Sequence, residues 1–189
     1  MEIIFISLNK NKFREVREIL KKYQIKVKRK PMKLREIQSI DVRKVIKEKI
    51  IYASEKIKEP FPFFVEDTSL EIESLNKFPG AFISYIQKTI GNKGILKLME
   101  NIENRNARAI CCLGLKLFNK IKIFEGVLNG KISYEEKGNG WGFDPIFMPE
   151  NSNKTLAELG KIKNEISHRK MALEKMAKYL LKYGKDALS

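Results

Sequence analysis

The sequence predicts an α/β fold in which helices flank a long, mixed and twisted sheet. The apolar run of residues 2–7 leads directly into a helical pattern, which is the strand–turn–helix order in which α/β proteins begin. Residues 106–133 form two long runs typical of a hairpin. We find no internal repeat and no low-complexity linker in the 189 residues, so we expect a single domain over residues 1–189.

The first part of the chain alternates between expected strands and helices. Residues 2–7 form a buried strand, and a helix over residues 10–23 follows it, with Asn9 as the N-cap. Residues 24–30 alternate as a second strand. Apolar residues at helical spacing then predict a helix over residues 42–58.

Prolines and glycines divide the next part. Pro60 and Pro62 end the preceding helix, and an apolar strand runs through residues 62–70. Residues 78–85 are expected to be a turn-rich loop, and a helix over residues 91–102 follows.

The last part contains the hairpin and a closing helix. The hairpin strands cover residues 106–118 and 120–133. The closing helix covers residues 167–184, with Ser167 as its N-cap and Gly184 as its stop.

The composition limits the classes of protein to which the chain can belong. Hydrophobic residues make up 43% of it, as in globular proteins. No apolar run approaches the roughly 18 residues that a membrane helix needs, and the N-terminal run lacks the basic flank of a signal peptide. Cys111 and Cys112 are adjacent, so on a strand they point to opposite faces and are poor disulfide partners. We therefore expect a reduced, cytoplasmic protein with no membrane partner.

The net charge of +15 suits an anionic partner such as a nucleotide, a nucleic acid or a membrane surface. Acidic residues are mixed with the basic ones along each segment, which favours a solvated surface over a general role in nucleic-acid binding.

A first candidate site is SLNKNK, where the first strand ends and a helix begins. Free N–H groups at a helix N-terminus bind phosphates. Ser7 and Asn9 add donors to this end, and Lys12 adds a full charge. A capped helix with surface lysines would give the same pattern.

A second candidate site is the acidic pair Glu66 and Asp67, followed by Thr68, in an apolar strand. Open α/β sheets bind ligands at the carboxyl ends of their strands. Adjacent acids repel each other unless a cation or lysines compensate them, and Mg²⁺ takes carboxylates together with substrate phosphates. The alternative is a turn in which Asp67 and Thr68 cap the backbone.

A third candidate site is the stretch GNGWGFDPIF. Trp141 or Phe143 can stack on a base, which is worth ~1–3 kcal/mol. Gly140 and Gly142 permit a close approach of the backbone, and Asp144 can accept a hydrogen bond from a ring N–H. A buried aromatic turn is the alternative.

A fourth candidate site surrounds the only histidine, His168, at the start of the closing helix. A neutral imidazole is favoured at a helix N-terminus and can bond a ligand. Arg169, Lys163 and Asn164 could join this site. An ordinary N-cap with a surface histidine is the alternative.

The order and spacing of these stretches resemble the inosine triphosphate pyrophosphatase family. The segments that carry the resemblance are Ser7–Lys12, Glu66–Thr68, Phe78–Phe82, Gly140–Pro145 and Ser167–Arg169. Such enzymes hydrolyse ITP, dITP and XTP to the monophosphate and pyrophosphate with Mg²⁺. The resemblance implies that activity here, with Mn²⁺ as a substitute ion, two lobes around a central nucleotide-binding cleft, a homodimer, and no obligate nucleic acid.

The resemblance also implies roles for individual residues. Contacts to the triphosphate are expected from Ser7, Asn9, Lys12 and Lys49. The metal would be bound by Glu36 and Asp67, and Asp67 would be the catalytic acid, with Thr68 as the next ligand contact. The base would contact Trp141, Gly142, Phe143 and Asp144, and the closing contacts would come from Lys163, His168 and Arg169.

We expect water to attack the α-phosphorus directly, with no covalent intermediate. Asp67 would position or deprotonate the water, while Lys12, Lys49 and Lys163 would balance the charge on the pyrophosphate. A pocket that presents donors would accept the 6-oxo group of hypoxanthine or xanthine, whereas adenine would leave a donor facing a donor.

Two other functions stay open. A basic nucleic-acid-binding module explains the charge and the aromatic–glycine loop, but it leaves Glu36, Glu66 and Asp67 unexplained, because acids repel phosphates without a metal. A related nucleotide pyrophosphatase could act on other modified bases.

Overall fold

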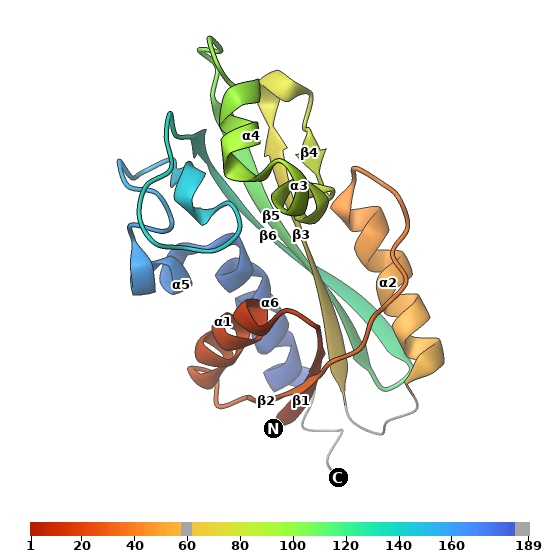
Figure 1. Cartoon of the computed structure of the whole chain (residues 1–189). Coiled ribbons are helices and arrows are strands. Elements are labelled where there is room, and N and C mark those ends of the chain that lie inside the picture. Colours follow the sequence, from red (N-terminus) through yellow and green to blue (C-terminus); the bar gives the residue numbers. More distant parts are fainter. Residues whose placement is uncertain (58–61, 184–189) are drawn as a thin grey trace.

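A mixed sheet forms the centre of the molecule, and helices cover both of its faces (Figure 1). The computed structural model describes residues 1–57 and 62–183. The strands are β1 (Glu2–Ile6), β2 (Lys26–Lys30), β3 (Phe63–Ile72), β4 (Pro79–Gly80), β5 (Asn106–Leu117), β6 (Lys120–Ile132) and β7 (Phe147–Pro149). The helices are α1 (Lys10–Lys21), α2 (Val42–Lys56), α3 (Ile83–Thr89), α4 (Gly91–Leu98), α5 (Lys163–Ile166) and α6 (His168–Tyr183). Short 3₁₀ turns cover Glu73–Leu75, Asp144–Ile146 and Gly160–Ile162. The predicted α/β class is confirmed.

The strand order brings the first two candidate segments together. The order is β2-β1-β3-β5-β6-β7, with β4 paired to β3. β1 is parallel to β2 and β3, and the other pairs are antiparallel. Because Phe5 pairs with Phe64, the chain leaving β1 passes beside Glu66 and Asp67 on β3. The lysine-rich strand β2 forms an edge of the sheet.

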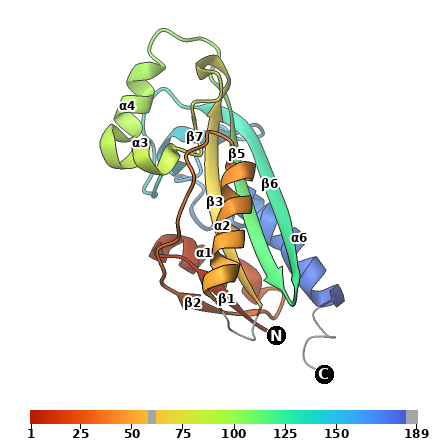
Figure 2. The same cartoon turned by 90° about the vertical axis from the view of Figure 1, so that its right-hand side faces the viewer.

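Alternation along the strands separates two cores. Ile3 and Phe5 pack with α1 and α6, whereas Ile4 and Ile6 pack with α2. α2 and α6 therefore lie on opposite sides of the sheet, as Figure 2 shows. Cys111 and Cys112 are free and lie in different cores, as predicted.

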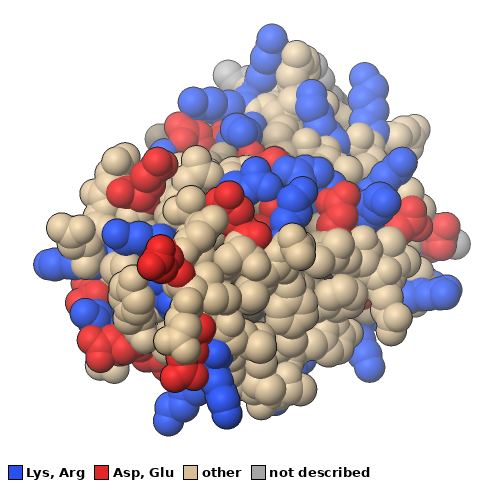
Figure 3. Space-filling model, turned by 90° about the horizontal axis from the view of Figure 1, so that it is seen from above, with Lys and Arg blue, Asp and Glu red and all other residues tan. Residues whose placement is uncertain are grey.

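The helices form two groups along the sheet (Figure 1). α1, α2 and α6 surround the lower half, while α3 and α4 lie at the upper end. A third core joins this upper group to β3, through Ile83 and Ile95 of the helices and Leu70 and Ile72 of β3. Strand β7 contributes Phe147 to the same core. Basic and acidic side chains are interspersed over the face seen from above (Figure 3).

The predicted caps are present. Asn9 accepts hydrogen bonds from the backbone nitrogens of Asn11 and Lys12, and Ser167 Oγ accepts one from Lys170. Pro60 and Gly184, expected to stop two helices, lie outside the described residues, and Pro62 lies just before β3.

Two sequence-based expectations are wrong. Residues 78–85 are not only a loop, because they contain β4 and the start of α3, whose Ile83 is buried in the third core. The prolines and glycines ahead of Ile83 concealed this helix. The expected helix over residues 91–102 ends at Leu98, and Asn101 has a φ of 59°, which an α-helix cannot continue through.

Within the described residues, no helix has both the length and the apolar character to cross a bilayer.

Replacing Gly126 on β6 with alanine should destabilise the fold. A Cβ there would lie 2.1 Å from the backbone oxygen of His168 and 2.6 Å from the backbone nitrogen of Ala172, so α6 would have to move away from the sheet. Overpacking of this kind lowers the free energy of unfolding by about 1–3 kcal/mol. Urea denaturation of Gly126→Ala measures this, with the exposed Lys131→Ala on the same strand as control. An unchanged stability would show that α6 has room to shift.

Candidate active site

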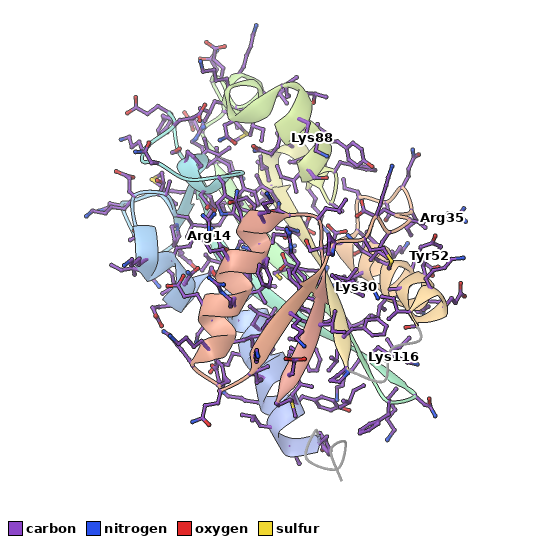
Figure 4. All side chains as sticks on the ribbon, turned by 60° about the horizontal axis from the view of Figure 1, so that its bottom comes forward. Arg14, Lys30, Arg35, Tyr52, Lys88 and Lys116 are labelled. Carbon is purple, nitrogen blue, oxygen red and sulfur yellow. The ribbon has the colours of Figure 1, made fainter. Side chains whose placement is uncertain are left out.

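A cavity of about 300 Å³ lies between the N-terminus of α1, strand β3, helix α3 and the loop before β7. The predicted residues that line it are Asn9, Lys12, Asp67, Thr68, Trp141, Gly142, Phe143, Asp144, His168 and Arg169. From α3, the cavity also receives Ser84, Gln87 and Lys88, which the sequence analysis did not select. Figure 4 shows Lys88 on the upper group of helices, across from α1.

The loop that enters α1 is organised by its own side chains. Ser7 Oγ accepts a hydrogen bond from the backbone nitrogen of Asn9 at 3.1 Å. Asn9 Oδ1 in turn accepts from Asn11 and Lys12 at 2.9 and 3.0 Å. The N-terminus of α1 carries partial positive charge, and Lys12 in its first turn lines the cavity. Lys12 Nζ also lies 3.3 Å from Glu66 Oε1.

Glu66 is a buried counter-ion. Its carboxylate accepts hydrogen bonds from Arg169 Nη2 at 2.8 Å and Nε at 3.1 Å, and from Thr68 Oγ1 at 3.2 Å. Burial acts to raise the pKa of Glu66, but Arg169 and then Lys12 outweigh it and hold that pKa far below its usual value of 4.5. Cations of the protein thus neutralise Glu66, which does not line the cavity, whereas Asp67 does line it.

Asp67 points to the other side of β3 and borders two cavities. It lines the 300 Å³ cavity and also a second cavity of about 170 Å³, which Glu36 and Tyr85 line as well. Lys49 Nζ lies 3.1 Å from Asp67 Oδ2 and 2.5 Å from Glu36 Oε1, so the two predicted metal ligands share one ammonium group.

The donor set at Glu36 and Asp67 fits a hard cation. Mg²⁺ is usually bound through one or two carboxylates together with substrate phosphates, without a complete cage of protein ligands. Within the part of the chain that the structure describes, no three His, Cys, Asp or Glu side chains form such a cage. Two carboxylates beside a cavity are compatible with an ion bound in this way.

Glu15 on α1 contacts residues of the candidate site and was missed by the sequence analysis. It accepts hydrogen bonds from Trp141 Nε1 at 2.7 Å and Lys163 Nζ at 2.6 Å, and it pairs with Arg169. Burial acts to raise the pKa of Glu15, but Arg169 and Lys163 prevail and lower it. A signal was present in the sequence, because Glu15 occupies the buried face of α1 beside Val16, where an acid needs a partner.

Lys163 lies beneath the loop that carries Trp141. It is 5% exposed, its Nζ is 2.5 Å from Asp144 Oδ2, and the same atom is 4.9 Å from the centre of the Trp141 ring. Asp144 is therefore already engaged by Lys163. The position favours a role for Lys163 in holding the loop over its expected role in balancing charge on the pyrophosphate.

His168 presents unpaired nitrogens in a buried position. Its ring is 2% exposed and stacks on Phe143 with the centroids 5.7 Å apart. Neither ring nitrogen has a hydrogen-bond partner among residues 1–57 and 62–183. Burial, reinforced by Arg169 and Lys163, lowers the pKa of His168 well below 6.5. The neutral ring therefore offers one donor and one acceptor in a cavity wall.

Gly142, which also lines the cavity, borders open space. Its φ is +64°, and an added Cβ would have no atom within 4 Å. Its carbonyl accepts a hydrogen bond from Asn92 Nδ2 at 3.0 Å, which ties the loop to α4. A flat ligand can thus approach the backbone here.

Comparison with known proteins agrees with this geometry. Residues 3–179 match the model of the Ham1 family. The chain belongs to the Ham1 family. A relative from Korarchaeum cryptofilum named dITP/XTP pyrophosphatase is 43% identical over 98% of this chain and 100% of its own length. Another of that name, from Pyrococcus horikoshii, is 42% identical over 97% and 100%. The solved Ham1 protein structure from Coxiella burnetii is similar with a TM-score of 0.79 and 29% identity, covering 96% of this chain and 99% of that one. The resemblance inferred from the motifs is confirmed.

The buried acid of this Ham1-family chain predicts a loss of stability in acid. Because the pKa of Glu66 is lowered in the folded protein, the stability that it contributes is present above pH ~4.5 and is lost as the pH falls below that value. Urea denaturation between pH 2.5 and 6 should therefore show a smaller pH dependence in Glu66→Gln than in wild type. The control is Glu100→Gln, at an exposed position. Equal pH dependence in Glu66→Gln and wild type would contradict the assignment.

Proposed function

We propose that this chain hydrolyses non-standard purine nucleoside triphosphates, such as ITP, dITP and XTP, to the monophosphate and pyrophosphate. The observation that carries the proposal is one cavity with two chemically distinct ends. One part of its lining is charged and includes Asp67 of β3 and Lys12 of α1, and another part includes His168, whose unpaired ring stacks on Phe143. The names of the relatives from Korarchaeum cryptofilum and Pyrococcus horikoshii, dITP/XTP pyrophosphatase, support the same substrates.

At the phosphate end, the side chains supply positioning and charge. We assign Asp67 to position or deprotonate the water that attacks the α-phosphorus, and Lys12 and Lys49 to contact the phosphates, with the Ser7–Asn9 turn holding the loop. A Mg²⁺ ion held by Glu36 and Asp67 would polarise phosphate oxygens and stabilise developing negative charge. Thr68 lies beside Asp67, and its backbone nitrogen donates to Asp67 Oδ1 at 2.9 Å, which orients the carboxylate.

At the base end, the proposed specificity follows from hydrogen-bonding capacity. His168 can donate to a 6-oxo group, whereas the 6-amino group of adenine would leave that donor unpaired, at about 1–3 kcal/mol. Trp141 and Phe143 supply the aromatic surroundings and Gly142 the open approach, while Asp144, Lys163 and Arg169 hold this loop through their buried contacts.

The same proposal includes the setting of the enzyme. We propose Mg²⁺ as the ion, with Mn²⁺ as a substitute, a single domain over residues 1–189, a homodimer, and action on the cytoplasmic nucleotide pool with no nucleic-acid partner.

The decisive test is pyrophosphate release from ATP, GTP, CTP, UTP, ITP and XTP in the presence of Mg²⁺. We expect ITP and XTP to be hydrolysed well above ATP, because a single unpaired group already gives about a five- to 150-fold preference. Guanine shares the 6-oxo group, so a preference over GTP requires a further contact that rejects its 2-amino group. Preferential release of pyrophosphate from CTP or UTP would favour the alternative function, a related nucleotide pyrophosphatase that acts on other bases. If no nucleotide released pyrophosphate, while DNA bound with a steep salt dependence, the nucleic-acid-binding alternative would be favoured instead.

Replacing Asp67 with asparagine should separate binding from turnover. Asp67→Asn keeps the shape of the side chain but loses the base, so we expect kcat for ITP to fall about 100- to 10,000-fold while ITP binding is retained. Quenched assays of pyrophosphate release from ITP measure kcat, and calorimetry measures the affinity for ITP. Glu48→Gln, an exposed acid on α2, is the matched control. Near-wild-type turnover in Asp67→Asn would remove Asp67 from the mechanism.

A further inference from the structure

Lys49 of α2 lies between the two carboxylates that would share a cation. Its Nζ is 2.5 Å from Glu36 Oε1 and 3.1 Å from Asp67 Oδ2. A third oxygen, the backbone carbonyl of Glu66, accepts from the same nitrogen at 3.3 Å. The ammonium group is therefore surrounded by three oxygens, from Glu36, Glu66 and Asp67, as a small bound cation would be.

We propose that the Lys49 ammonium is a resident counter-ion, which a divalent cation must displace before it can bind Glu36 and Asp67 together. This inference rests on the proposed function, because it concerns the carboxylates assigned there to the metal. It adds that these carboxylates are not available to a free ion in the nucleotide-free protein.

Electrostatics supports the competition. Glu36, Asp67 and Lys49 together carry a single net negative charge, and a divalent ion approaching them meets a positive group already in contact with both acids. The Lys49 side chain is 11% exposed and that of Asp67 15%, so solvent screens this group weakly. Glu36 is the more open member at 38%.

The adjoining cavities give the displaced ammonium another partner. Asp67 lines both the 300 Å³ cavity and the 170 Å³ cavity, so phosphates near Asp67 would lie within the surroundings of Lys49. A lysine binds phosphate as a point charge and needs no fixed geometry. Lys49 thus exchanges carboxylates for phosphates when the nucleotide arrives, and the carboxylates become available to the ion at that moment. The protein accordingly binds ion and triphosphate together, and binds the ion alone weakly.

The test is a titration of the nucleotide-free protein with Mn²⁺, with free ion measured by electron paramagnetic resonance. We expect Lys49→Met to bind Mn²⁺ about tenfold or more tightly than wild type, because the competing charge is gone. Lys47→Met removes the same charge from an exposed position on the same helix, and we expect it to bind within about twofold of wild type. Adding Glu36→Gln to Lys49→Met should abolish the gain. Equal or weaker binding of Mn²⁺ by Lys49→Met would overturn the proposal.

Thermal unfolding provides a second readout that does not depend on activity. Without metal, Lys49→Met should melt below wild type, since two carboxylates lose their partner, and Mn²⁺ should raise its melting temperature more than that of wild type. An equal or smaller rise would also count against the proposal, and Lys49→Gln serves the same comparison if Lys49→Met does not fold. Pyrophosphate release from ITP by wild type is measured separately. Its absence would refute the proposed function, whereas the Mn²⁺ comparison would still decide whether Lys49 blocks the carboxylates.

Discussion

The arrangement of the cavity depends on a buried chain of charges that runs from Glu66 through Arg169 and Glu15 to Lys163 and Asp144. These five side chains come from β3, α6, α1, α5 and the 3₁₀ turn before β7. Each of these residues is at most 9% exposed, so removing one side chain leaves its neighbour charged and buried, which typically destabilises a protein by about 3–5 kcal/mol. The chain of charges thereby fixes the relative positions of elements that are far apart in sequence.

The same charges determine what the cavity offers a ligand. The carboxylates of Glu66 and Glu15 form ion pairs with cations of the protein, so they add little electrostatic repulsion toward phosphates. His168 packs against this network but takes no hydrogen bond from it, and burial, reinforced by positive neighbours, keeps its ring neutral by lowering its pKa. The buried ion pairs thus occupy both acids, while His168, which lines the cavity, keeps its hydrogen-bonding capacity.

Most of the fold could be predicted because its causes are local. Apolar alternation gave the hairpin of β5 and β6, helical spacing gave α1, α2 and α6, and the cap of α1 followed from Asn9. The motifs also identified most of the cavity wall. Glu15 was missed because its partners are 126 to 154 residues away and periodicity carries no information about them. The burial of Lys163 was missed for the same reason. Helix α3 was missed because Pro79 and Gly80 lie shortly before its first residue, Ile83.

The edge strand β2 has a consequence for how the molecule behaves among its copies. Among the residues that the structure describes, its backbone faces a neighbour, β1, on one side only, and Lys26, Lys28 and Lys30 alternate along it, with Lys30 labelled in Figure 4. An open strand edge is a template on which another chain can extend the sheet. Charged side chains along such an edge disfavour pairing with the same edge of a second molecule, although Lys26 and Lys28 also form ion pairs with Glu2 of β1. Part of the surplus positive charge thus serves as a safeguard against fibrous aggregation at high protein concentration.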